Sequence, residues 1–307
     1  MLRRNELKRA LAEGRACSAA WVFTADVDAA EILGTCGFDA LILDRQHTPV
    51  SFERTREQLR AVRAAGDSTV LVRVRENSAA EIAVLLDMGV EGLLLPDARS
   101  VDDVRRFVSA TRYPPAGDRG AHDTVSRAAG WGAETARYRA QYRDELLLVA
   151  MIESRAGAGE VARMCREPGL DMIFLGPLDL SASVGALGDW DDEDYLSTVR
   201  TVEASVREER TLLGGALAPP GDVADWVRRG HRLLSVGNDV SMIRDSARRQ
   251  LSLRLHACRG GVVTRPGRRN GRDAEPSAIR APAPAGSSTW IRGSTGASPA
   301  RSPRVRD

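Results

Sequence analysis

Residues 148–185 read LVAMIESRAGAGEVARMCREPGLDMIFLGPLDLSASVG and decide the fold of this chain. Two short apolar runs, at 146–152 and 172–175, have the length and composition of buried strands. Residues 156–166 between them carry apolar side chains at helical spacing. The stretch therefore predicts a strand, a helix and a strand, about one repeat of a parallel β/α fold.

An acidic residue follows each of these two predicted strands. Glu153 comes directly after the first strand, and Asp179 comes after a Gly-Pro-Leu turn behind the second. Because the carboxyl ends of parallel strands open onto the ligand side of an α/β fold, both acids should lie on the same rim. Two carboxylates one repeat apart on that rim could hold one divalent cation.

The same alternation of strands and helices continues along the rest of the chain. Further strands are expected at 19–23, 38–43, 69–74, 92–95, 211–217 and 233–236. Further helices are expected near the N-terminus and at 27–34, 53–65, 79–88, 101–111, 134–141, 195–208, 223–229 and 240–251. Eight strands alternating with helices in 307 residues predict an α/β fold, a TIM (β/α)8 barrel with an N-terminal helix.

A doubly wound open sheet gives the same alternation and is the second choice for the fold. The barrel is favoured because polar candidates follow strands all around the chain order, instead of gathering at one switch point. A long loop, RYPPAGDRG at 112–120, has the length of a working loop.

The C-terminal segment differs in composition from the rest. Residues 259–307 hold ten arginines against three acidic residues, although the whole chain has a net charge of only +2. This segment is rich in Arg, Pro, Gly and Ser and has few large apolar residues, so it is expected to be disordered. We therefore expect a barrel domain at 1–254 and a tail at 255–307. A solvated extension is favoured over a nucleic-acid contact for this tail.

The thiols and amines restrict the chemistry. The four cysteines have no metal-binding spacing and are expected to be free, so a metal would need oxygen ligands. Lys8 is the only lysine and is expected on a solvent-facing helix, which excludes lysine Schiff-base chemistry. The N-terminus lacks the apolar core of a signal peptide and no run reaches the length of a membrane span, so a cytoplasmic location is expected.

Several polar or aromatic side chains occur within or just after the predicted strands and would converge in a closed barrel. They are Trp21, Asp44, His47, Arg73, Glu153 and Asp179. Together they provide a cation, a histidine close to an aspartate, and two acids suited to a metal.

Each of these residues also has a plain structural reading. Glu153 fits a salt bridge or a helix cap, and Asp179 fits the N-cap of a short helix. His47 fits a loop histidine, Arg73 could pair with any nearby acid, and Trp21 is by default a core residue. The hypothesis of a metal-centred site depends on the combination.

At this point the chain from about residue 7 to residue 251 resembles the metal-dependent pyruvate aldolases of the HpcH/HpaI aldolase/citrate lyase family. The matching stretches are GFDALILD at 37–44 with His47, VR at 72–73, LLDMG at 85–89, ATRYPPAG at 110–117 with RG at 119–120, IESR at 152–155, GPLDLS at 176–181 and VGND at 236–239. The RYPPxGxRG and GPxDLS motifs together are quite specific to this family.

The resemblance implies a TIM barrel and a role for each matching residue. Glu153 and Asp179 fall on the metal ligands, and Arg73 falls on the arginine that binds substrate and stabilises charge. His47 falls on the catalytic histidine, Asp44 on the acid that orients it, and Trp21 on an aromatic residue at the cavity wall. The resemblance further implies a homo-oligomer, usually a hexamer.

The chemistry of 2-oxo acids agrees with these roles. Pyruvate can chelate Mg²⁺, Mn²⁺ or Co²⁺ and leave two positions for protein carboxylates. Backbone N–H groups around Gly176, Pro177 and Leu178 could hold the substrate carboxylate. The predicted activity is cleavage or formation of a 4-hydroxy-2-oxo acid, giving pyruvate and an aldehyde through a metal-stabilised enolate.

Two alternatives remain open from the sequence. The same metal site could serve an acyl-CoA lyase or an oxaloacetate decarboxylase, or the barrel could be a non-catalytic binding module. One departure from the family bears on this choice, because Gln46 stands where the family usually has Glu directly before the histidine. Aldehyde specificity is expected in loops such as 112–123 and in neighbouring subunits.

Overall fold

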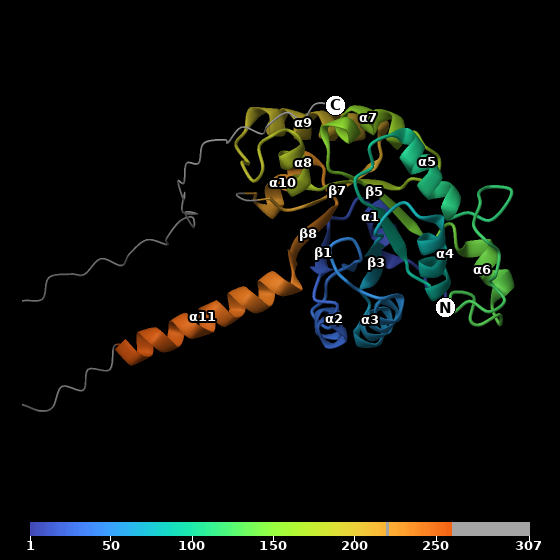
Figure 1. Cartoon of the computed structure of the whole chain (residues 1–307), viewed down its shortest axis with the longest axis horizontal. Coiled ribbons are helices and arrows are strands. Elements are labelled where there is room, and N and C mark those ends of the chain that lie inside the picture. The colour runs from blue at the N-terminus through green and yellow to red at the C-terminus, as the bar shows by residue number, and fades with distance from the viewer. Residues whose placement is uncertain (219–220, 260–307) are drawn as a thin grey trace, which may run out of the picture. The chain divides into compact units, whose positions relative to one another are not determined.

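The computed structural model describes residues 1–218 and 221–259. Within these residues eight parallel strands pair in chain order, and β1 closes the ring against β8 (Figure 1). The predicted TIM barrel is confirmed, and closure of the ring rules out the open doubly wound sheet. The compact unit spans residues 1–258. The predicted tail falls almost wholly within residues 260–307, outside the described part of the chain.

The strands lie close to their predicted positions. Their bounds are β1 Cys17–Val22, β2 Ala40–Asp44, β3 Thr69–Arg73, β4 Gly92–Leu95, β5 Leu147–Ile152, β6 Met172–Leu175, β7 Leu212–Ala216 and β8 Leu233–Asn238.

Most of the helices cover the outside of this ring, whereas α1 packs against the inner core and α11 extends away from the barrel (Figure 1). Their bounds are α1 Glu6–Ala12, α2 Val27–Gly34, α3 Phe52–Ala65, α4 Ala79–Met88, α5 Val101–Ala110, α6 Thr135–Gln141, α7 Arg155–Cys165, α8 Pro177–Ser183, α9 Glu193–Glu209, α10 Val223–Arg229 and α11 Asp239–Arg259. Two differences from the sequence expectations stand out. The short helix α8 was not predicted as an element, and α11 continues beyond its predicted end at residue 251.

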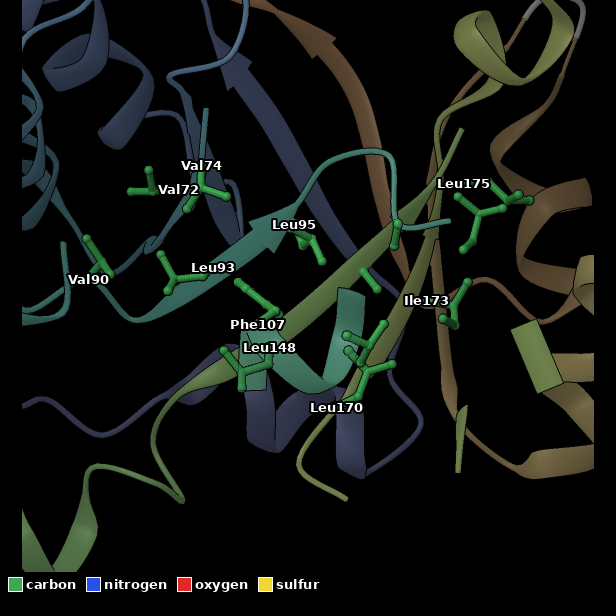
Figure 2. Close-up of a cluster of buried hydrophobic side chains, with 14 of the residues drawn as sticks. Val72, Val74, Val90, Leu93, Leu95, Phe107, Leu148, Leu170, Ile173 and Leu175 are labelled. Atoms are coloured by element: carbon green, nitrogen blue, oxygen red, sulfur yellow. The ribbon is translucent and has the colours of Figure 1, made fainter. Parts of the chain in front are cut away.

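Alternation along each strand produces two separate cores. In β5, Leu147, Val149 and Met151 fill the barrel interior, whereas Leu148 and Ala150 face the surrounding helices. Figure 2 shows the outer core, in which side chains of neighbouring strands meet Phe107 of α5. Burial of each large aliphatic side chain contributes roughly 2 kcal/mol. The strands are apolar on both faces because both faces are buried.

Short polar caps begin the helices soon after the strands end. The side chains of Asp26, Ser51, Ser78 and Ser154 each accept a hydrogen bond from a backbone N–H in the first turn of the following helix. Gly89 ends α4 in the left-handed conformation, with φ 86°. These caps turn the chain sharply, so side chains that follow a strand stay at the carboxyl rim of the barrel.

Lys8 does not face solvent, and that expectation is wrong. Its Nζ lies 2.9 Å from Oδ1 of Asp171 and donates to the carbonyl of Leu146 at 2.7 Å. Both partners directly precede strands, so Lys8 lies at the amino end of the barrel, opposite the rim that carries Glu153. A Schiff base with a substrate at that rim is therefore excluded by the position of Lys8.

The loop predicted to be a working loop is built into the same amino side. Arg119 is buried among the rings of Tyr113, Tyr138 and Tyr142, and its NH2 group donates to Oδ1 of Asp87 at the end of α4. Helices of this fold run antiparallel to the strands, so the end of α4 lies far from the carboxyl rim. Within one chain, this part of the loop belongs to the scaffold and does not line the site.

Two further expectations concern the thiols and the membrane. Cys17, Cys36 and Cys165 are free thiols, as predicted, whereas the side chain of Cys258 lies outside the described residues. Among the described helices, none has both the length and the apolar character needed to cross a bilayer.

Candidate active site

The alternation of side chains between the two faces of each strand, which builds the inner core, also determines which site residues face inward. Asp44, Arg73 and Glu153 continue the inward-facing series of β2, β3 and β5 and lie at or just beyond the carboxyl ends of those strands. Asp44 and Arg73 are Cα partners in the β2–β3 register. The structure thus brings together three of the predicted site residues, and backbone pairing alone sets two of them side by side.

Arg73 connects the two acidic sides of this group. Its Nε donates to Oδ1 of Asp44 at 2.6 Å, and its NH1 lies 4.0 Å from Oε1 of Glu153. The guanidinium also lies over the ring of Trp21, 4.5 Å from the centroid. Trp21 is buried and stacks on Phe23, so it supports Arg73 from below.

Asp44 organises the loop that follows β2. Its carboxylate accepts hydrogen bonds from the backbone N–H groups of Gln46 and His47 and from the hydroxyl of Thr48. The predicted relationship between Asp44 and His47 therefore runs through the backbone of the histidine and not through its imidazole. The His47 side chain is exposed at the rim.

Glu153 is a buried carboxylate with an altered pKa. Its Oε2 accepts the backbone N–H of Asp97 at 2.7 Å. Burial raises the pKa of Glu153 to about 7, and the nearby charge of Asp179 pushes it the same way, while the Asp97 N–H and Arg73 oppose the shift. The carboxylate is thus held where its negative charge is incompletely compensated by protein groups.

Gly176 lets the Glu153 side chain pack directly against its backbone. A Cβ at this position would lie 2.6 Å from Oε1 and Cγ of Glu153. Gly176 is also the N-cap of α8, with Pro177 at the first helical position, so Asp179 belongs to the first turn and the N-cap interpretation of Asp179 is wrong. Asp179 is exposed on the side of the helix start.

The backbone around Gly176 offers fewer donors than expected. The N–H of Gly176 already donates to the carbonyl of Ile152 at 3.1 Å, and Pro177 has no N–H. The first-turn amides of Leu178 and Asp179 have no carbonyl partner within the helix. A substrate carboxylate would therefore meet these two amides and not those of the preceding residues.

Asp97 was missed by the sequence reasoning. It follows β4 directly after Pro96, adopts a positive φ of 43°, and positions Glu153 through its backbone. Its Oδ2 accepts from Nε of Arg99 at 2.7 Å. An acid after the LLLP run was a usable signal, because other candidates were chosen by that same criterion.

The donor set fits a divalent cation that prefers oxygen ligands. Among residues 1–218 and 221–259, no group of three or more His, Cys, Asp and Glu side chains is placed to hold a metal. Glu153 and Asp179, whose charges act on each other, could supply two carboxylate oxygens. Such a pair leaves most of an octahedral shell to substrate and water, as for Mg²⁺ or Mn²⁺.

A closed parallel barrel with a buried carboxylate and an arginine at its carboxyl rim defines a β/α-barrel enzyme. The chain belongs to the HpcH/HpaI aldolase/citrate lyase family, whose model matches residues 18–246. The family resemblance and the expected class of enzyme, a carbon–carbon lyase, are both confirmed.

Similar proteins cover nearly the whole barrel. A hydroxypyruvate/pyruvate aldolase of Chromohalobacter salexigens is 36% identical over 253 residues, which are 82% of this chain and 98% of the relative. A 2-keto-3-deoxy-L-rhamnonate aldolase of Shigella dysenteriae is 35% identical, over 81% and 92% of the two chains. A crystal structure of a family member from Burkholderia cenocepacia is 32% identical, with a TM-score of 0.76 over 81% of this chain and 98% of that one.

Proposed function

We propose that this enzyme is a divalent-metal-dependent aldolase that cleaves or forms a 4-hydroxy-2-oxo acid, with pyruvate and an aldehyde as the other partners. The observation that carries the proposal is Glu153, a buried carboxylate at the carboxyl rim whose pKa is raised by burial and by the charge of a second acid, Asp179. A buried carboxylate with only a structural role is expected to lie in close contact with a positively charged side chain. Arg73 instead approaches it only to 4.0 Å.

Glu153 and Asp179 would hold the cation, which when bound supplies Lewis acidity to the keto oxygen of the substrate. Arg73 adds a fixed positive charge for the oxygen that becomes negative in the enolate. Asp44 and Trp21 hold Arg73 in position. Asp44 accepts the hydrogen bond of Nε, and the ring of Trp21 lies against the guanidinium group. Trp21 in this assignment is a positioning residue beneath the substrate.

His47 and the start of α8 complete the assignment. The imidazole of His47 is exposed at the rim, where it can take the proton of the C4 hydroxyl during cleavage and return it during addition. Asp44 fixes the backbone from which this imidazole projects. The amides of Leu178 and Asp179 bind the carboxylate of the 2-oxo acid.

The deciding experiment measures exchange of the pyruvate methyl protons in D₂O, with the protein loaded with Mn²⁺ or Mg²⁺. We expect wild type to exchange these protons and Glu153→Ala to lose both exchange and metal binding. Glu160→Ala, which removes an acid of α7 paired with Arg163 on the helix surface, is the matched control and should change neither. Wild-type protein that does not exchange, together with unchanged metal binding by Glu153→Ala, would remove the proposal.

The helix α11 supports a homo-oligomer, for which the resemblance suggests six subunits. Val240, Ile243, Ala247 and Leu251 are exposed and form one stripe at helical spacing. The helix extends from the end of β8 away from the barrel (Figure 1). An exposed apolar stripe of this length is typical of an interface. Sedimentation should show a multimer for wild type and smaller species for Ile243→Glu.

A further inference from the structure

A cavity opens among the segments that follow the strands at the carboxyl rim of the barrel. Its volume is about 290 Å³, and its polar lining consists of Gln46 after β2, Arg75, Glu76 and Asn77 after β3, Asp97 after β4 and Asp103 of α5. The space corresponds to roughly ten water molecules, enough for a short-chain aldehyde. None of these residues has a role in the proposed handling of the 2-oxo acid, apart from the backbone of Asp97.

Two residues that line this cavity donate backbone hydrogen bonds to acids of the proposed reaction site. The backbone N–H of Asp97 donates to Glu153 at 2.7 Å, and that of Gln46 donates to Asp44 at 3.2 Å. Asp44 and Glu153 flank Arg73 on its two sides. Two of the lining segments are therefore hydrogen-bonded to the acids that flank Arg73, and the cavity lies on the side of the barrel formed by β2, β3 and β4.

Two acceptor oxygens in these walls lack donors. Oε1 of Gln46 and Oδ1 of Asp97 are buried, and neither has a hydrogen-bond partner among the described residues. Buried acceptors without a donor are costly and are rare in folded proteins. Rotation about the terminal torsion of either side chain can present its oxygen to the cavity. A ligand that brings hydroxyl groups would satisfy both oxygens.

The charges of the lining argue against an acidic ligand. Among the described residues that line the cavity, Arg75 is the one cation, against Glu76, Asp97 and Asp103. Nε of Arg75 already donates to the carbonyl of Arg45. An aldehyde that itself carried a carboxylate would meet no excess of positive charge in this cavity.

We propose that this cavity binds the hydroxylated end of the aldehyde, with Gln46 as a specificity-determining residue. This inference rests on the proposed aldolase function and names its second substrate as a short hydroxyaldehyde. The hydroxyl beside the aldehyde carbon donates to Oε1 of Gln46, and Oδ1 of Asp97 accepts from a further hydroxyl where one is present.

The test measures the aldol addition of pyruvate to glycolaldehyde and to acetaldehyde. These two aldehydes differ by one hydroxyl group. Wild type should show the higher kcat/KM with glycolaldehyde. Gln46→Met, which keeps the length of the side chain but removes the acceptor, should reduce this preference about tenfold. Gln46→Glu keeps an acceptor oxygen and should retain the preference. The ratio of the two aldehydes within each variant cancels any loss common to both.

Proton exchange of pyruvate in D₂O separates this inference from the function on which it rests, because exchange requires no aldehyde. Exchange should be the same in wild type and both Gln46 variants, which also shows that the variants are folded. Wild-type protein without exchange would overturn the aldolase and the inference together. Normal exchange, with an aldehyde preference that is absent or unaffected by Gln46→Met, would overturn the inference alone.

Discussion

Arg73 and Asp44 form a buried ion pair at the carboxyl end of the barrel, with Nε of the arginine 2.6 Å from Oδ1 of the aspartate. The two residues are Cα partners on adjacent strands, so the sheet register determines their contact. Because Asp44 also accepts the N–H groups of the following loop, the pair ties the strand ends to the segment that carries His47. The direction of the Arg73 guanidinium is thereby fixed before substrate binds.

Arg73→Lys should retain the charge and lose activity. Lysine cannot offer the planar fork that bonds Asp44 along one edge and faces Glu153 along another. We expect kcat/KM for cleavage to fall by about 100-fold, with little change in the circular dichroism spectrum. Arg137→Lys, on the exposed face of α6, is the control and should behave as wild type. Near-normal activity of Arg73→Lys would show that charge alone suffices.

Glu153→Gln should stabilise the metal-free protein above neutral pH. The pKa of Glu153 is raised from 4.5 to about 7, so its ionisation in the folded state costs stability as pH rises through this range, and the cost is complete above it. At pH 8 in EDTA the variant should gain up to about 3 kcal/mol in the free energy of unfolding. At pH 4.5 the gain should largely vanish.

Urea unfolding at the two pH values measures this difference. Added Mg²⁺ should then stabilise wild type and not Glu153→Gln, because the amide is a poorer ligand for the cation. Equal stability of both proteins at pH 8 would mean that Glu153 is well compensated by its neighbours in the metal-free state.

Gly176→Ala should weaken metal binding without straining the backbone. Gly176 has φ −100°, which alanine adopts readily, but the new Cβ would press on the Glu153 carboxylate at 2.6 Å. Titration calorimetry with Mn²⁺ should show at least a tenfold loss of affinity, in line with other displaced ligand geometries. Gly159→Ala in α7 meets nothing within 4 Å and should be neutral or slightly stabilising.

His231 should make the protein less stable in mild acid. The residue is buried, its Nε2 lies 3.0 Å from Oε1 of Glu203, and burial lowers its pKa below the usual 6.5. As pH falls below 6.5 the unfolded chain takes up a proton before the folded chain does, so stability declines by at most about 1.4 kcal/mol per pH unit. His231→Gln keeps a donor but does not titrate.

The measurement is the free energy of unfolding of wild type and His231→Gln at pH 7.5, 6.5 and 5.5. Groups that do not contact His231 contribute equally to both proteins, so the difference between the two curves reports the histidine together with its partner Glu203. Parallel curves would indicate that His231 keeps its ordinary pKa in the folded protein.

Much of the site was predictable because the end of a strand, and the alternation of side chains between its two faces, can be read from the local sequence. The expected ranges for β4, β6, α2, α4 and α10 agree with the structure, and residues 44, 73 and 153 face inward by simple alternation from the inner core. The long loop after α5 was harder to place, because loop length indicates only that a segment is unusual. Whether such a segment faces the carboxyl or the amino rim depends on contacts such as that between Arg119 and Asp87.

The sequence by itself determined the barrel and the candidate residues at the strand ends, because both follow from residue type and short-range periodicity. Its single lysine left one candidate for Schiff-base chemistry, and only the structure placed that residue at the opposite end of the barrel. The tertiary structure alone decided which groups touch. It joined Lys8 to Asp171, directed Asp44 to the backbone of His47, and placed the N–H of Asp97 on Glu153. These contacts arise when the ring closes and brings distant segments together, so no local pattern encodes them.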